Sequence, residues 1–140
     1  MNLWVPGKPR GQGRPRAVRR GNHAGVHKAK EDEQNEQWIE ACWLAEGKPR
    51  LEGAISLTIA AYFDRPKGHF LKDGSLSKPG RRAAFYTSKP DGDNILKAVC
   101  DALNGRAWAD DAQIIRATVA KNWSGRAGAG IRILAYELDL

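Results

Sequence analysis

The stretch AISLTIAAYF, residues 54–63, alternates apolar and polar side chains. Its apolar side chains occupy every second position from Ile55 to Phe63, and polar residues such as Ser56 and Thr58 lie between them. Because successive side chains of a β-strand point to opposite faces, this alternation predicts a strand. We therefore expect residues 54–63 to form part of a sheet, with at least one buried face.

Further elements are expected on both sides of this strand. Apolar spacing and flanking Gly or Pro residues predict helices at about residues 31–46 and 93–104, and strands at about 2–5, 113–122 and 131–138. The Gly-rich turn at residues 124–130 suggests a hairpin. Two basic loops, at about residues 8–28 and 65–89, separate these elements. The order is β-loop-α-β-loop-α-β-β, an α+β fold with a single mixed β-sheet and two principal helices. We expect one domain over residues 1–140.

Basic charge is concentrated in two segments. The 140 residues carry a formal net charge of +7, from 23 Lys and Arg against 16 Asp and Glu. Residues 1–30 hold eight basic side chains and no acid, and residues 65–89 hold seven against one acid. These segments together carry +14, so the remainder carries −7. Segregated charge on Gly- and Pro-rich loops favours a polyanion such as nucleic acid, although two solvated loops without a partner are the alternative.

The composition disfavours several other classes of protein. With 41% hydrophobic and 28% charged residues, the chain resembles a folded domain rather than a disordered one. Its apolar stretches are far shorter than the roughly 20 residues of a membrane span, and no apolar segment of a secretory signal opens the sequence. Cys42 and Cys100 form neither a disulfide framework nor a zinc motif. We therefore expect a cytoplasmic protein.

Carboxylates gather in one region of this basic chain. The run KPDGDN at residues 89–94 is followed by Lys97, Asp101 and the pair Asp110 and Asp111. If residues 91–93 are extended, both of their carboxylates face one site, and the later pair could return beside the first turn of the helix. Carboxylates in that number favour Mg²⁺ or Mn²⁺, and no His lies here to favour zinc. Lys97 could then donate to a phosphate oxygen.

Each acidic residue also has an ordinary structural interpretation. Asp93 or Asn94 suits a helix cap, and Asp93 with Lys97 suits an i,i+4 surface pair. Asp110 and Asp111 suit a solvated turn before a strand. Taken singly, these interpretations are the better ones. Taken together in a strongly basic chain, the residues favour a metal site to which the cations could bring a phosphate polymer.

The same residues resemble the RusA-type Holliday junction resolvases of bacteria and their prophages. The matching pattern is KPDxDNxxKxxxDALNG over residues 89–105 and WxDDxQI over residues 108–114. The stretches VPGKP (5–9) and GRPR (13–16) also look like the family's opening, so the resemblance covers nearly the whole chain. A lone DxD is weak evidence, whereas so many fixed positions are highly specific. At position 92, where the family often has a bulky apolar residue, this chain has glycine.

The resemblance implies a homodimeric, Mg²⁺-dependent endonuclease that makes paired symmetric nicks in a four-way DNA junction. It implies Asp91, Asp93 and Asp111 as the catalytic, metal-binding carboxylates, with Asp110 ranked below them. It also implies Lys97 as a catalytic residue. The expected products are a 5′-phosphate and a 3′-hydroxyl. A junction has two-fold symmetry, which gives a physical reason for a two-fold dimer.

Other residues complete the expected site. Asn94 is expected to cap the helix or to support the metal ligands, and Asp101 to hold Lys97. The basic segments are expected to bind the arms of the branched DNA through Lys8, Arg10, Arg14, Arg16, Arg19, Arg20, Lys72, Lys78, Arg81, Arg82 and Lys89.

Two competing functions stay open on the sequence alone. The first is a non-catalytic basic nucleic-acid-binding protein, in which the acids are caps and surface pairs. The second is a nucleotide-sugar transferase of the DxD type, which the short chain makes improbable. Metal-dependent nicking of branched DNA distinguishes the resolvase from both.

Overall fold

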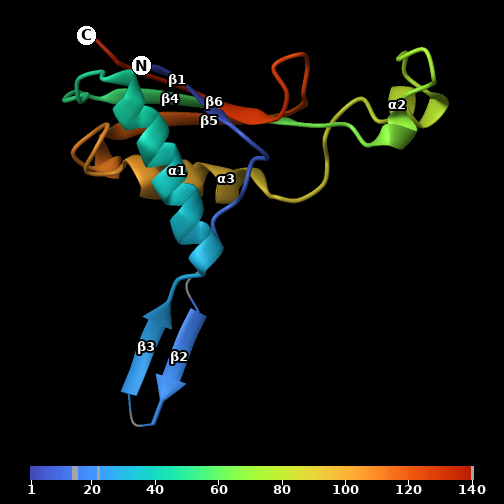
Figure 1. The fold of residues 1–140 in the computed structure, drawn as a ribbon. Coiled ribbons are helices and arrows are strands. Elements are labelled where there is room, and N and C mark those ends of the chain that lie inside the picture. Colours follow the sequence, from blue (N-terminus) through green and yellow to red (C-terminus); the bar gives the residue numbers. More distant parts are fainter. Residues whose placement is uncertain (14–15, 22, 140) are drawn as a thin grey trace.

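A mixed β-sheet organises the chain (Figure 1). The computed structural model describes the backbone of residues 1–13, 16–21 and 23–139, and the side chains of residues 1–13, 21 and 28–139. In this described part, the main sheet has four strands in the order β1-β6-β4-β5. Their bounds are Asn2–Pro6 for β1, Ile55–Phe63 for β4, Ile114–Trp123 for β5 and Gly130–Glu137 for β6. Antiparallel β1–β6 and β6–β4 pairs and a parallel β4–β5 pair confirm the predicted mixed sheet.

β4 lies inside the sheet, as its alternating sequence requires. It pairs with β6 on one side and with β5 on the other, so the ladders satisfy its backbone groups on both edges. Ile55, Leu57 and Ile59 are fully inaccessible to solvent, and Phe63 is nearly so. This row of side chains is the face predicted to be buried.

Two helices cover one face of the sheet (Figure 1). They are α1 (Lys30–Glu46) and α3 (Gly92–Leu103), which agree with the predicted helices within one residue at each end. α3 buries Ile95 and Val99 completely, and α1 buries Ile39. These side chains belong to the same apolar core as β4. No helix in the described ranges is long and apolar enough to cross a membrane.

The predicted hairpin between β5 and β6 is wrong. The two strands are not neighbours, because β4 lies between them in the sheet. The connecting segment begins where the Ser124 amide donates to the Phe63 carbonyl at the end of β4, and it then crosses the end of that strand. β4 pairs with both strands over most of its length, and burying it on both edges outweighs the local preference of the Gly-rich turn.

The two basic segments have more structure than predicted. In the first, β2 (Arg16–Arg20) and β3 (His23–His27) form an antiparallel pair that projects away from the main sheet (Figure 1). The second contains a 3₁₀ turn, η1 (Lys67–His69), and a short helix, α2 (Lys78–Arg82). Of the predicted DNA-binding residues, Arg14 lies outside the described residues. The side chains of Arg16, Arg19 and Arg20 lie outside them too.

Candidate active site

Asp91 is placed by the start of α3. It is the N-cap residue, with φ −68° and ψ 148°, and the helix begins at Gly92. The expectation that residues 91–93 are extended is therefore wrong, because Asp93 already lies in the first helical turn. Both carboxylates are still close to the helix N-terminus, where the helix dipole stabilises negative charge.

Gly92 fits this helix start without special geometry. A Cβ built at Gly92 would lie 3.7 Å from Val119 Cγ1, which is an ordinary van der Waals contact. Its backbone is not in the left-handed region. A side chain at position 92 would therefore point towards Val119 on β5.

Lys89 neutralises Asp91 at the protein surface. Its Nζ lies 2.9 Å from Asp91 Oδ1, but the Lys89 side chain is 84% exposed and that of Asp91 50% exposed. An ion pair this exposed contributes little to stability, so a ligand can replace it at small cost. Asp91 is therefore available to bind a cation.

Lys121 holds the segment that leads into Asp91. From β5, its Nζ donates to the Ser88 carbonyl at 2.8 Å and to the Pro90 carbonyl at 3.0 Å. The Tyr86 hydroxyl also donates to the Lys89 carbonyl. Sequence reasoning missed Lys121, although it alternates along the strand with Val119 and Trp123, which are half-buried against the core. A lysine in line with two apolar residues of a strand is the signal that could have found it.

The first basic segment is packed against the same helix start. The Gln12 amide donates to the Asn94 carbonyl at 2.8 Å. A Cβ at Gly11 would lie 2.8 Å from Pro90 Cβ and 2.9 Å from Asn94 Cβ, so only glycine fits. This contact brings the segment that carries Lys8 close to Asp91. It also gives Asn94 an observed backbone role, as an anchor for the N-terminal segment.

Lys97 and Asp101 are paired as expected. Lys97 Nζ donates to Asp101 Oδ2 at 3.0 Å along α3. The structure shows no ion pair between Lys97 and Asp93 among the described residues. The ammonium group of Lys97 is therefore held on the side of α3 that faces its C-terminal half.

Asp111 lies beside the C-terminal end of α3. It begins η2 (Asp111–Gln113), its amide donates to Asn104 Oδ1, and its Oδ1 accepts a 2.7 Å hydrogen bond from Trp108 Nε1. Asn104 is the C-cap of α3. The expectation that this acidic pair returns beside the first turn of the helix is therefore wrong.

Asp110 has a different position from Asp111. Its Oδ1 accepts from the Ala112 amide at 2.8 Å, and Gln113 Oε1 accepts from the Asp110 amide at 3.0 Å. This is a capping box that closes η2. Asp110 therefore has a structural task in the turn, which agrees with its lower rank as a metal ligand.

Burial and neighbouring acids make Asp111 a weaker acid than usual. Its pKa is raised first by desolvation, and also by the charges of Asp101 and Asp110, while the Trp108 hydrogen bond and Lys97 act in the opposite direction. Burial raises the pKa of the adjacent Cys100 thiol to about 12, with further contributions from Asp111 and Asp101. The field here is negative, and a bound cation would relieve it.

The carboxylates nevertheless form two groups within one chain. Asp91 and Asp93 lie at the N-terminus of α3, whereas Asp111 is held by Asn104, the C-cap of α3, and by Trp108. Over the described residues, no three His, Cys, Asp or Glu side chains gather closely enough to hold one metal ion. Among the described residues of one chain, Asp91, Asp93 and Asp111 therefore do not form one cluster.

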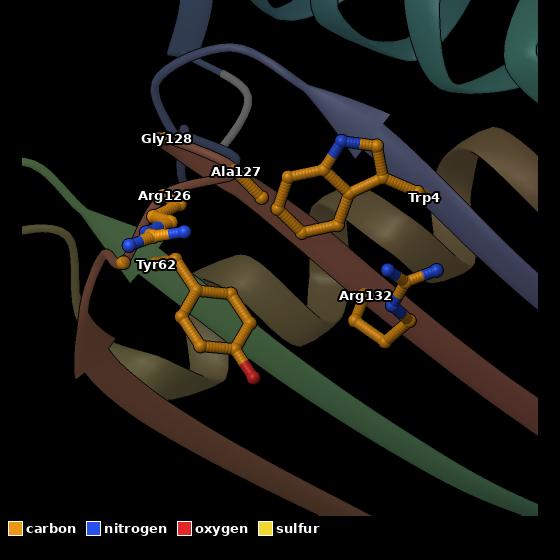
Figure 2. Close-up of a pocket in the computed structure, with 7 residues that line it drawn as sticks. Trp4, Tyr62, Arg126, Ala127, Gly128 and Arg132 are labelled. Carbon is orange, nitrogen blue, oxygen red and sulfur yellow. The ribbon is translucent and has the colours of Figure 1, made fainter.

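A pocket of about 270 Å³ lies on the face of the sheet that α1 and α3 leave uncovered (Figure 2). Trp4 and Tyr62 line it from β1 and β4, with Arg126 and Arg132 beside them. The guanidinium of Arg132 lies 4.9 Å from the centre of the Trp4 ring. No carboxylate lines this pocket, so the pocket is separate from the acidic residues of the candidate active site.

The basic side chains predicted to bind DNA are mostly free at the surface. Five of them are exposed and form no ion pair with the described acids: Lys8, Lys72, Lys78, Arg81 and Arg82. Lys89 is also exposed, and it pairs with Asp91. Arg10 is different, because it pairs at 2.9 Å with Asp32, whose side chain is almost fully buried. Arg10 therefore holds the first basic segment against α1.

Comparison with known proteins identifies the family of this chain. The family model described as Endodeoxyribonuclease RusA matches residues 6–134. The chain is also 30% identical over 126 residues to the uncharacterized protein YqaN of Bacillus subtilis (strain 168), an alignment that covers 89% of this chain and 88% of that one. The matched range includes every residue of the acidic region and both basic segments. This chain therefore belongs to the RusA family of endodeoxyribonucleases, which are Holliday junction resolvases.

Proposed function

We propose that this chain cuts four-way DNA junctions as a homodimer, through paired symmetric nicks in recombination, repair or phage DNA processing. Each nick adds water across one phosphodiester bond and leaves a 5′-phosphate and a 3′-hydroxyl. The proposed catalytic residues are Asp91, Asp93, Lys97 and Asp111. The observation that carries the proposal is that all four lie along or beside one helix, α3, within the region that matches the family.

Mg²⁺ is the proposed cofactor, with Mn²⁺ as a substitute. The available donors are carboxylates, which are the ligands that these hard cations prefer. Because Asp91 and Asp93 are separated from Asp111 within one chain, we propose that the cation is held only after two copies pair. Asp91 and Asp93 of one copy would then lie opposite Asp111 of the other.

The exposed edge of β5 supports this pairing. β5 pairs with β4 on one side and with no described strand on the other, and it packs against α3. Ile115 on this strand is 65% exposed. A two-fold axis at this edge, perpendicular to α3, would run two copies of α3 in opposite directions, so that the N-terminus of each helix lies beside the C-terminus of the other.

The remaining roles follow from the observed contacts. Lys97, oriented by Asp101, would donate to an oxygen of the scissile phosphate. The exposed basic side chains of the two segments would bind phosphates of the junction arms and add a strong salt dependence to binding. DNA is the proposed substrate, so we propose that the enzyme acts in the cytoplasm, with the whole chain as one endonuclease domain.

A cleavage assay tests this function. A synthetic four-way junction with labelled arms is incubated with the chain, with and without Mg²⁺, and both nicks are mapped; a linear duplex of one arm is the substrate control. We expect symmetric nicks only in the junction and only with the cation. Asp91→Asn should abolish cleavage while binding survives, and Asp73→Asn, in the second basic segment, should cut normally. Binding without any nicking would instead identify a non-catalytic nucleic-acid-binding protein.

A further inference from the structure

Phe85 is the most exposed of the large apolar side chains in the described part of the chain, at 78%. It lies six residues before Asp91, in the yellow segment that connects α2 to α3 (Figure 1). A single exposed apolar side chain is common on a protein surface, so the case for a partner depends on what surrounds Phe85.

The backbone around Phe85 is fixed from both sides. Before it, the Ala83 carbonyl accepts hydrogen bonds from Trp123 Nε1 at 2.9 Å and from the Arg65 guanidinium at 3.1 Å. After it, the Tyr86 ring stacks on Phe63 with 3.8 Å between ring centres and 1° between planes. The backbone on both sides of Phe85 is therefore anchored, so this exposed side chain has a fixed position and does not belong to a mobile loop.

The anchoring side chains also connect Phe85 to the catalytic segment. Tyr86 lies at an angle of 84° to the Trp123 ring, and the Lys121 ammonium lies 5.3 Å from the centre of the Tyr86 ring. The same ammonium holds the Ser88 and Pro90 carbonyls immediately before Asp91. The position of Phe85 relative to Asp91 is thus set by one connected group of side chains.

The surroundings of Phe85 are basic. Arg81, Arg82 and Lys89 are all exposed within four residues of it, and no acid lies in residues 74–90. An apolar protein partner would not favour such a charge pattern, whereas a DNA backbone does. Apolar side chains flanked by basic ones are typical of proteins that insert a wedge between base pairs.

We propose that Phe85 is a wedge that inserts at the branch point of the bound junction, stacks on a base there and fixes which phosphate reaches Asp91. The proposal rests on the proposed function and adds how the substrate is recognised. Bases at a branch point are already partly unstacked, so insertion costs less there than in a continuous duplex. The wedge therefore favours branched over linear DNA.

The test uses junctions that carry 2-aminopurine at the branch point, bound by the full chain in the Asp91→Asn background, which prevents cleavage. We expect the fluorescence to rise on binding and the additional Phe85→Ala change to remove that rise. Junction affinity should fall about 10- to 100-fold, the size of one base–aromatic stack, while affinity for linear duplex stays constant. Phe85→Trp should restore both signals. Phe70→Ala is the matched control. Phe70 is 45% exposed and belongs to the same basic segment, residues 65–89, but it lies before α2, whereas Phe85 lies after it.

Four results would overturn the wedge. Unchanged fluorescence and affinity in Phe85→Ala would show that the ring does not touch the bases. A shift from dimer to monomer in sedimentation would assign Phe85 to the contact between two copies. A parent chain that neither binds nor cuts junctions would overturn the proposed function as well, whereas normal junction cutting by an Asp91-containing Phe85→Ala chain overturns the wedge alone.

Discussion

Lys97 Nζ lies 3.0 Å from Asp101 Oδ2, one helical turn further along α3. In this pair the base precedes the acid, which is the less favourable order for a helix, and both side chains are partly exposed. Its contribution to stability is therefore at most about 0.5 kcal/mol. The pair orients the ammonium group near Asp111 rather than holding the fold together.

Lys97→Met is expected to lower kcat for junction cleavage about 100- to 1,000-fold, the usual cost of removing a donor to developing charge. Asp101→Asn should lower it about 10- to 100-fold, because Lys97 stays but loses its orientation. Junction affinity and thermal stability should change little in either variant. Lys48→Met, outside α3, is the control. Normal cleavage by Asp101→Asn would show that Asp101 does not position Lys97 for the reaction.

Lys121→Met is expected to separate cleavage from binding. Without its two hydrogen bonds to Ser88 and Pro90, the segment before Asp91 loses its support, and the free energy of unfolding should fall by about 1–3 kcal/mol. Cleavage should fall more than junction affinity, because Asp91 is displaced while the basic surface remains. Lys72→Met is the control, because Lys72 is an exposed lysine of the second basic segment. It should weaken junction binding without lowering the rate of cleavage at saturating junction concentration.

Gly11→Ala is expected to displace the first basic segment from α3. Its Cβ would meet Pro90 and Asn94 at less than 3.0 Å, so the unfolding free energy should fall by about 1–3 kcal/mol. Gly68→Ala is the control, because nothing lies within 4 Å of a Cβ there. Chemical denaturation measures both. Equal stability of the two variants would mean that the contact with Asn94 does not hold in solution.

The raised pKa of Asp111 predicts a pH dependence of stability with a definite sign. Since the folded chain holds that proton more tightly than the unfolded chain, stability falls as pH rises from the usual aspartate range through the raised pKa. Asp111→Asn removes this cost and keeps an acceptor for Trp108. It should therefore raise the melting temperature at pH 7, less so near pH 4 and below, while abolishing cleavage. The sign would be contradicted if the gain in melting temperature of Asp111→Asn over the parent were smaller at pH 7 than at pH 4.

Mixing two inactive chains tests whether the site is shared. If Asp91 of one copy acts with Asp111 of the other, a mixed dimer of Asp91→Asn and Asp111→Asn chains has one intact site and one doubly changed site. The mixture should therefore nick one strand of the junction, although each variant alone is inactive. If each site belonged to one chain, the mixed dimer would stay inactive. Size-exclusion chromatography with light scattering confirms that mixed dimers form.

The elements with strong periodicity could be predicted from sequence. Apolar side chains alternate over the nine residues of β4, and Ile95, Val99 and Leu103 recur at helical spacing in α3. Because each pattern buries one face in only one type of secondary structure, it predicts a strand in the first case and a helix in the second. The motif at residues 89–94 likewise indicated the family, whose model matches residues 6–134. The pairing of Lys97 with Asp101 followed from helical spacing alone.

Long-range pairing was decided only by the tertiary structure. A turn such as residues 124–130 suits a hairpin locally, but insertion of β4 between β5 and β6 depends on contacts distant in sequence. For the same reason, nothing near Asp111 in sequence indicates that Asn104 and Trp108 hold it at the far end of α3 from Asp91. Side-chain type and spacing were enough to select the residues proposed for the chemistry, because both can be read along the chain. Their separation into two groups depends on how α3 lies between them, which only the packed chain establishes.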